Sequence, residues 1–147
     1  MAAVRTATVT WQGDLANGSG GVSSGSSGTF QDLPVSWASR TEAPEGRTSP
    51  EELLAAAHAS CFAMAFSAGL GKAGTPPEHL HVEAEVTFDK VGDDWTVVSS
   101  ALTVLGRAPG SSEEDFLAAA EAAKDGCPIS RALKGNVQLS VDATYEE

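Results

Sequence analysis

An uncharged, alanine-rich segment between residues 53 and 71 constrains the fold of this chain more than any other feature. It lies within SPEELLAAAHASCFAMAFSAGLGKAG, where Ser49 is a suitable N-cap and Pro50 suits the first helical position. Gly71 or Gly74 can end such a helix. We predict one long buried helix that is apolar around most of its circumference, and its many alanines would allow another helix to approach closely.

The same segment raises the question of a membrane span, because it carries no formal charge. Alanine is only weakly apolar, and His58, Ser60 and Ser67 interrupt the run. No aromatic or basic flanks bracket it. The net charge of −11 would also repel anionic headgroups and phosphate backbones. We therefore expect neither a membrane nor a nucleic acid as partner.

A length of 147 residues suits a single domain spanning 1–147. The start MAAVRTATVTW lacks the basic and apolar regions of a secretion signal, so we expect a cytoplasmic protein. Two cysteines are too few for a secreted disulfide scaffold, and a reducing cytosol would keep them as thiols.

The remaining segments predict strands and helices in an α+β order. Alternating, β-branched runs predict strands at 3–11, 33–37, 80–91, 94–106 and 136–147. The polar residues 38–48 are expected to form a loop. A helix over 111–124 would bury Phe116, Leu117 and Ala120, and a short turn follows at 128–134. The Gly/Ser-rich stretch 13–29 lacks the Gly-Lys-Ser/Thr ending of a phosphate-binding loop.

Two cysteines stand in different settings. Cys61 lies among small and apolar residues, where a thiol is ordinarily inert unless a cation or helix N-terminus lowers its pKa. Arg40 and Arg47, just before the long helix, are the available permanent cations. Gly-Cys-Pro is expected to expose Cys127 at the start of a helical turn, although ordinary turn chemistry also explains it. The two thiols suggest a sulfenic acid and disulfide pair, but their spacing does not show that they meet.

Glu51 and Glu52 lie in the first helical turn, where acids favour the helix dipole and Glu52 can complete a capping box. Ten residues separate Glu51 from Cys61. At roughly 1.5 Å per residue the two lie about 15 Å apart along the axis, which is beyond contact. A role for Glu51 in Cys61 chemistry therefore requires a spanning arginine or a second subunit, and two antiparallel copies of the helix would place the site at a dimer interface.

His58 is predicted to be a hydrogen-bonded core histidine that orients its neighbours. The alternative is a zinc site formed with Cys61, Cys127, His79 and His81, since sulfur and imidazole are the ligands that zinc prefers. No compact CxxC or HxxxH pattern supports it, so we predict no metal. A GxSxG serine-nucleophile motif does not occur either.

Two long stretches of this sequence resemble a known family. SPEELLAAAHASCFAMAFSAGLGKAG and AKDGCPISRALKGNVQLSVDATY closely resemble the osmotically inducible protein C branch of the family that also contains the organic hydroperoxide resistance proteins. The similarity extends upstream through VTWQGDLANGSGGVSSGS and VSWASRTE, so it covers nearly the whole chain. The resemblance implies an intertwined α+β homodimer with antiparallel sheets packed around two long central helices.

The resemblance also implies a thiol-dependent peroxidase that prefers organic hydroperoxides to hydrogen peroxide. Cys61 matches the peroxidatic cysteine and Cys127 the resolving one. Glu51 matches the glutamate that holds the active-site arginine, and Arg40 in SRTE matches the arginine of the osmotically inducible branch. The other branch carries its arginine in a glycine-rich turn, where LANGSGG here has none, so the choice between Arg40 and Arg47 stays open.

On this reading Phe62, Met64 and Phe66 line an apolar substrate pocket beside the thiol. No cofactor is expected, and an external thiol or a dihydrolipoyl group would reduce the disulfide. The expected partners are a second copy of the chain and an organic hydroperoxide. The alternative is a redox-inactive dimeric protein that binds a small ligand on the same scaffold.

Overall fold

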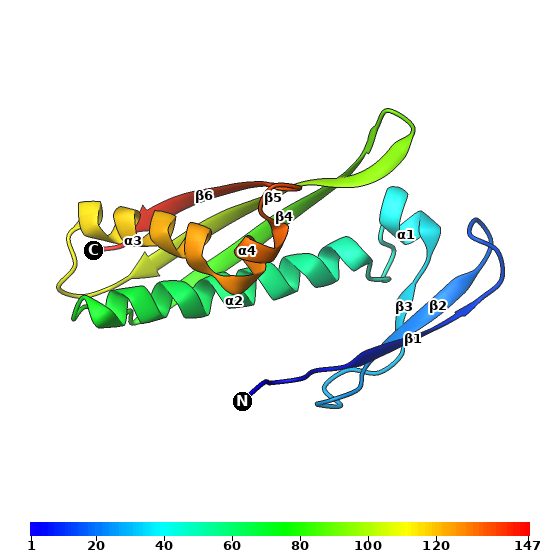
Figure 1. Cartoon of the computed structure of the whole chain (residues 1–147), viewed down its shortest axis with the longest axis horizontal. Helices are drawn as coiled ribbons and strands as arrows, with labels where there is room; N and C mark the ends of the chain where they lie inside the picture. Colours follow the sequence, from blue (N-terminus) through cyan, green and yellow to red (C-terminus); the bar gives the residue numbers. More distant parts are fainter. The chain divides into compact units, whose positions relative to one another are not determined.

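The computed structural model describes all residues from Met1 to Glu147, and they form two compact units, Met1–Leu53 and Leu54–Glu147. Each unit contains one three-stranded sheet. Four helices complete the chain, and the element order confirms the predicted α+β class (Figure 1).

The first unit contains a small antiparallel sheet in the order β1 (Ala7–Gln12), β2 (Ser19–Ser24) and β3 (Leu33–Val35). Glycine is needed in β2 because Trp11 of β1 lies across it. A Cβ atom added to Gly20 would stand 2.9 Å from the Trp11 ring, closer than side-chain atoms normally approach. The Gly/Ser-rich stretch therefore gives the indole room to lie flat on the sheet.

A short helix, α1 (Trp37–Thr41), replaces the predicted end of a strand and the start of a polar loop. Ser36 causes the change, because its side chain accepts a hydrogen bond from the Ser39 backbone N–H at 3.1 Å. The Ser36 N–H in turn donates to the Ser39 hydroxyl at 3.0 Å. This reciprocal cap begins a helix directly after β3 and carries Arg40 on it.

The long predicted helix is α2 (Pro50–Lys72). Ser49 caps it as expected, since its hydroxyl accepts from the Glu52 N–H at 3.1 Å. The Glu52 carboxylate accepts a hydrogen bond from the Thr48 hydroxyl. Gly74 follows the helix with a φ of 82°, a conformation that favours glycine.

Only one face of α2 is fully buried within the single chain. The buried face repeats about every fourth residue, with His58, Phe62, Phe66 and Leu70. On the opposite side an exposed stripe contains Ala56, Ala57, Ser60, Met64, Ser67 and Ala68. By length and apolar composition alone α2 would also suit a membrane span, a weak indication that core helices share.

The second unit contains a sheet in the order β4 (His79–Val91), β5 (Asp94–Arg107) and β6 (Gln138–Tyr145). β4 and β5 form the predicted antiparallel hairpin, with a register shift between Thr87 and Phe88. β6 is parallel to β5, which corrects the expectation of purely antiparallel sheets. Two helices, α3 (Glu113–Gly126) and α4 (Pro128–Leu133), form the crossover that makes the parallel pairing possible.

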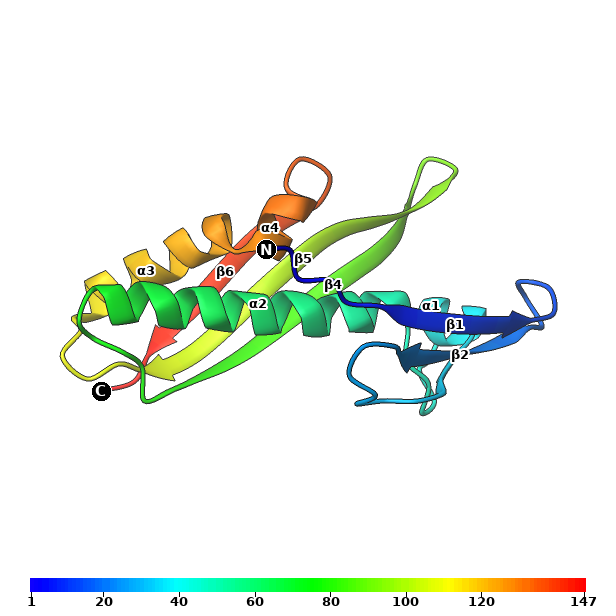
Figure 2. The ribbon, with the colours of Figure 1, turned by 60° about the horizontal axis from the view of Figure 1, so that its bottom comes forward.

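The core of this unit lies between one face of the sheet and the helices α2 and α3, which run side by side (Figures 1 and 2). Phe66 is at its centre, with ring centroids 5.6 Å from Phe62 and 4.9 Å from Phe116. Leu117 was predicted to join Phe116 on the buried face, but it is 37% exposed. One residue turns a helix by about 100°, which carries Leu117 away from the buried stripe.

Candidate active site

The second unit brings the two cysteines together. Cys61 lies on α2 and Cys127 is the N-cap of α4, and both are free thiols. Their side chains are close enough for Cys127 to raise the pKa of the Cys61 thiol. The fold thus provides the contact that the sequence spacing alone could not establish.

Cys127 is fully buried, so the predicted exposure of this thiol is wrong. Its predicted position at the start of a helical turn is confirmed. The sulfur accepts from the backbone N–H of Ser130 at 3.3 Å, and the thiol donates to the Ser130 hydroxyl at 3.2 Å. These contacts turn the side chain inward as a helix cap, away from solvent.

Burial raises the pKa of the Cys61 thiol, which is only partly accessible. A hydrogen bond from the backbone N–H of Ile129 opposes this effect, the neighbouring Cys127 adds to it, and the positive charge of Arg131 lowers the pKa. Arg131 was not among the residues predicted from the sequence. Its position one turn after the Cys127 cap could have indicated it, because residues four apart lie on one face of a helix.

His58 is fully buried and bridges two serines. Its Nδ1 atom lies 2.6 Å from the Ser100 hydroxyl of β5, and its Nε2 atom lies 2.8 Å from the Ser130 hydroxyl of α4. This confirms the predicted hydrogen-bonded core histidine. Burial lowers the pKa of its imidazole.

Of the zinc ligands considered from the sequence, only Cys61 and Cys127 come together. No group of three or more His, Cys, Asp or Glu side chains is placed to hold a metal ion. His79 lies 3.4 Å from the carboxylate of Glu146, and His58 is occupied by its two serines.

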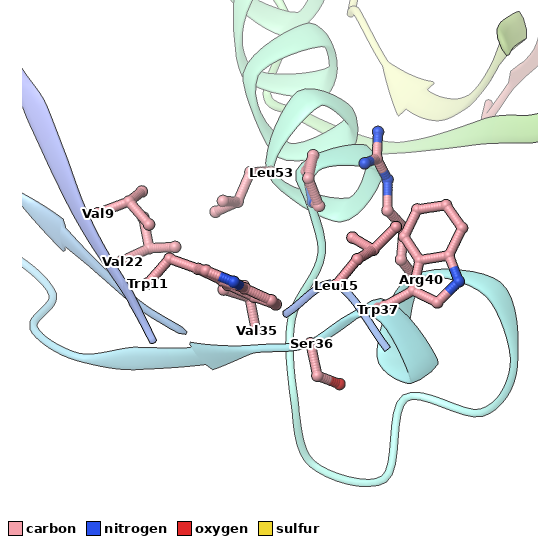
Figure 3. A pocket seen from close by; sticks show the side chains of 10 residues that line it. Val9, Trp11, Leu15, Val22, Val35, Ser36, Trp37, Arg40 and Leu53 are labelled. Atoms are coloured by element: carbon pink, nitrogen blue, oxygen red, sulfur yellow. The ribbon is translucent and has the colours of Figure 1, made fainter. Parts of the chain in front are cut away.

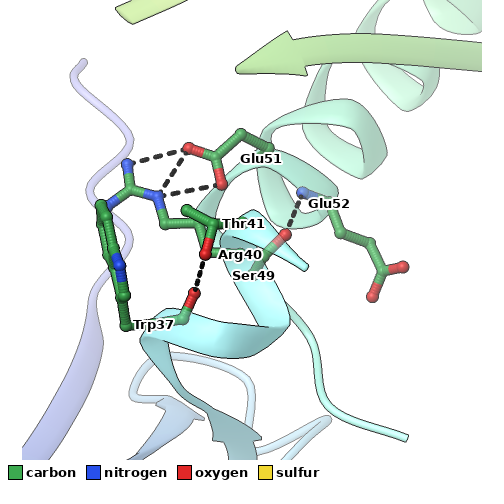
Figure 4. A network of polar contacts seen from close by, with 6 residues as sticks. All are labelled: Trp37, Arg40, Thr41, Ser49, Glu51 and Glu52. Atoms are coloured by element: carbon green, nitrogen blue, oxygen red, sulfur yellow. Dashed lines mark hydrogen bonds and ion pairs between the residues drawn. The ribbon is translucent and has the colours of Figure 1, made fainter. Parts of the chain in front are cut away.

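In the first unit, Glu51 pairs with Arg40 (Figure 4). The Arg40 Nε donates to both carboxylate oxygens, at 3.0 and 3.1 Å, and Nη2 lies 2.8 Å from Oε1. Glu51 is 7% exposed, and the guanidinium lies 5.8 Å from the centre of the Trp37 ring. Arg47 is exposed in the turn before α2. The arginine that Glu51 holds is therefore Arg40.

An apolar cavity of about 330 Å³ lies in the same unit (Figure 3). Arg40 and Ser36 are its polar side chains, and the others are apolar: Val9, Trp11, Leu15, Val22, Val35, Trp37, Pro50 and Leu53. The pocket predicted around Phe62, Met64 and Phe66 is not present. Both phenylalanines fill the core of the second unit, and Met64 is 68% exposed.

Fold and site together define an α+β protein with two adjacent thiols and a buried glutamate that holds an arginine. The family described as OsmC-like protein matches residues 43–142. The chain is 40% identical over 129 residues to Peroxiredoxin OsmC of Escherichia coli strain K12, a match that covers 88% of this chain and 89% of that protein. This chain belongs to the OsmC-like family.

Solved structures agree with this assignment. The organic hydroperoxide resistance protein OhrB of Bacillus subtilis has a TM-score of 0.70 at 25% identity, over 95% of this chain and 98% of that one. An OsmC-like protein of Mycoplasma pneumoniae has a TM-score of 0.76 at 15% identity over the full length of both chains, which supports the fold alone. At the level of the family, these relatives indicate a peroxidase-type function related to hydroperoxides.

Proposed function

We propose that this chain reduces organic hydroperoxides, and hydrogen peroxide more slowly, with Cys61 as the peroxidatic cysteine and Cys127 as the resolving one. The observation that carries the proposal is the proximity of the two thiols, which lie far apart in sequence. A sulfenic acid formed on one would stand next to the thiol that can condense with it.

The reaction is balanced without a cofactor. The Cys61 thiolate attacks the terminal peroxide oxygen, the oxygen–oxygen bond breaks, and the leaving alkoxide takes a proton to become an alcohol. Cys127 then attacks the sulfur of the Cys61 sulfenic acid, which releases water and forms the disulfide. An external thiol or dihydrolipoyl group supplies the two electrons that restore both thiols.

Cys61 needs a stabilised thiolate, yet burial raises its pKa within the single chain. We infer that the missing stabilisation comes from Arg40, delivered to Cys61 in a homodimer. The exposed stripe of α2 supports this inference, because it is uncharged and made of small residues and Met64. Such a surface suits close packing against a second α2.

The cavity of the first unit supports a preference for organic peroxides. Its lining is almost entirely apolar, and Arg40 provides the cation on its wall (Figure 3). An alkyl or aryl group would bind there by burial of apolar surface, while the guanidinium would polarise the peroxide. Hydrogen peroxide lacks such a group and would gain nothing from the cavity.

The test is consumption of cumene hydroperoxide and of hydrogen peroxide by the purified protein, with dihydrolipoamide as reductant. We expect faster loss of the organic peroxide, and loss of catalysis in Cys61→Ser. Cys127→Ser should still undergo one oxidation per site with the organic peroxide. His81→Gln, at an exposed position on β4, is the control that keeps the full rate. A Cys61→Ser protein with the wild-type rate would exclude the proposal.

The raised pKa of Cys61 and the apolar cavity together favour one alternative, a redox-inactive dimer that binds a small apolar ligand. Alkylation of Cys61 as a function of pH separates the two. A thiol that ionises well below its ordinary range in the assembled protein supports the peroxidase, because a binding protein has no need of it.

A further inference from the structure

We propose that Ser130 and His58 form a proton relay that removes the thiol proton of Cys127 when Cys127 attacks the oxidised Cys61. The inference rests on the proposed function and deepens it, because it assigns the groups that drive disulfide formation. Ser130 contacts the reacting sulfur. His58 is a positioning residue that acts through Ser130.

Four side chains from three elements form the relay. The Cys127 thiol donates to the Ser130 hydroxyl oxygen at 3.2 Å. Because this oxygen accepts from the thiol, the hydroxyl's own proton is available for His58 Nε2, at 2.8 Å. In the tautomer that the relay uses, Nε2 carries no proton and Nδ1–H faces the Ser100 hydroxyl at 2.6 Å. The Ser100 hydroxyl can accept from Nδ1–H and so is compatible with the tautomer in which Nε2 accepts a proton.

Burial makes the relay the available route for the proton. The side chains of the relay are at most 1% exposed, so bulk water does not reach Cys127 directly. The groups that face His58 are the Ser100 hydroxyl from β5 and the Ser130 hydroxyl from α4. Burial lowers the pKa of His58, which keeps the ring neutral near pH 7 and ready to accept. The charge of Arg131, also on α4, acts on Cys61.

The transfer is balanced. Cys127 gives its proton to Ser130 as Ser130 gives its own to His58 Nε2. The sulfur, held by the Ser130 backbone N–H at 3.3 Å, attacks the Cys61 sulfur. The sulfur–oxygen bond of the sulfenic acid breaks, and the departing hydroxide takes up one proton to become water. His58 returns to its neutral state by releasing the proton it accepted, and no further oxidant or reductant is consumed.

The test separates oxidation of Cys61 from its resolution. Reduced protein is mixed with one equivalent of cumene hydroperoxide, quenched at intervals, and analysed by intact mass, because the sulfenic acid and the disulfide differ by one water. We expect His58→Gln and Ser130→Ala to slow disulfide formation roughly 100-fold, the lower range for loss of a general base, and to leave oxidation of Cys61 unchanged. Ser130→Thr, which keeps the hydroxyl, should restore the rate.

A pH profile distinguishes a relay from a purely structural role. Disulfide formation in the wild type should fall as His58 becomes protonated at acidic pH and be level near neutrality. In His58→Gln it should instead rise about tenfold per pH unit, following ionisation of the unassisted thiol. His81→Gln is the matched control and should keep the wild-type profile. The proposal would be overturned if His58→Gln slowed the oxidation of Cys61 and disulfide formation equally, or if it left the pH profile of disulfide formation unchanged.

A second assay keeps the inference separate from the peroxidase proposal. Ellman's reagent converts Cys61 to a mixed disulfide and releases one coloured aryl thiolate, and attack by Cys127 then releases a second one without any peroxide. His58-dependent release with no reaction toward peroxide would retain the relay and reject the peroxidase. Release that is independent of His58 would reject the relay, whatever the peroxide does.

Discussion

A charged side chain that is nearly removed from water needs a partner, and Glu51 has one in Arg40. The carboxylate is 7% exposed and accepts two hydrogen bonds from one guanidinium nitrogen. A fork of donors on a planar cation fits a carboxylate better than an ammonium does, so lysine would be a poor substitute. The pair therefore fixes the direction of the guanidinium as well as its charge.

Removal of one member of this pair should cost stability. We expect Arg40→Ala to lower the free energy of unfolding by about 2 to 3 kcal/mol, at the low end of buried pairs, because the Arg40 side chain is 30% exposed. Urea unfolding measures the change. Arg47→Ala, at an exposed position, is the control and should differ from the wild type by less than about 0.5 kcal/mol. An Arg40→Ala protein as stable as this control would show that Glu51 is held by other means.

At the scale of elements, α2 has two faces with different tasks. The buried face fixes the helix to the sheet through tightly packed aromatic side chains, and the exposed stripe remains available for another surface. Cys61 lies between the two faces and is only partly accessible. Its position lets it contact Cys127 within the chain while remaining reachable from outside.

The buried face of α2 should dominate the stability of the second unit. We expect Phe66→Ala to lower the free energy of unfolding by about 3 kcal/mol or more, because it leaves a cavity among Phe62, Phe116 and the sheet. Leu117→Ala on α3 is the control, because Leu117 is 37% exposed and should cost about 1 kcal/mol or less. Equal losses in the two variants would contradict the assigned core.

The sequence predicted most of the helices and strands, but less of how they pair and which of their residues are buried. Alternation and capping residues located β4, β5 and both long helices, because these signals are local. The reciprocal Ser36 and Ser39 cap went unnoticed, so α1 was missed. The parallel pairing of β6 and the burial of Cys127 depend on the path of α3 and α4, which no local pattern encodes.

Only some residues of the candidate site could be predicted, because the others depend on packing that no local pattern encodes. The family resemblance pointed to Cys61, Cys127, Arg40 and Glu51, and the contacts of both pairs are present in the fold. The role of Ser130 had no signal of its own, because a serine in a short helix is common. Phe62 and Phe66 were assigned to a pocket because aromatic residues suit both pockets and cores, and only packing distinguishes the two.

At the scale of the whole molecule, a second copy of the chain is proposed to cover the exposed stripe of α2. We expect Met64→Glu to weaken the dimer, because a carboxylate would have to lose its water in an apolar contact. Sedimentation velocity across a range of protein concentrations measures the effect, with peroxidase activity recorded on the same samples. Val91→Glu, at an exposed position on β4, is the control and should leave both unchanged. A Met64→Glu protein that sediments like the wild type would place the interface elsewhere.

The contact between Cys61 and Cys127 also has a consequence for the chain as a polymer. A covalent bond between them would close a ring that contains β4, β5 and α3, close to half of the sequence. The denatured oxidised chain would then be a loop with two tails, with fewer conformations and a smaller radius than the denatured linear chain. Its migration in a denaturing gel without reductant would therefore record the fraction of molecules that had completed the chemistry.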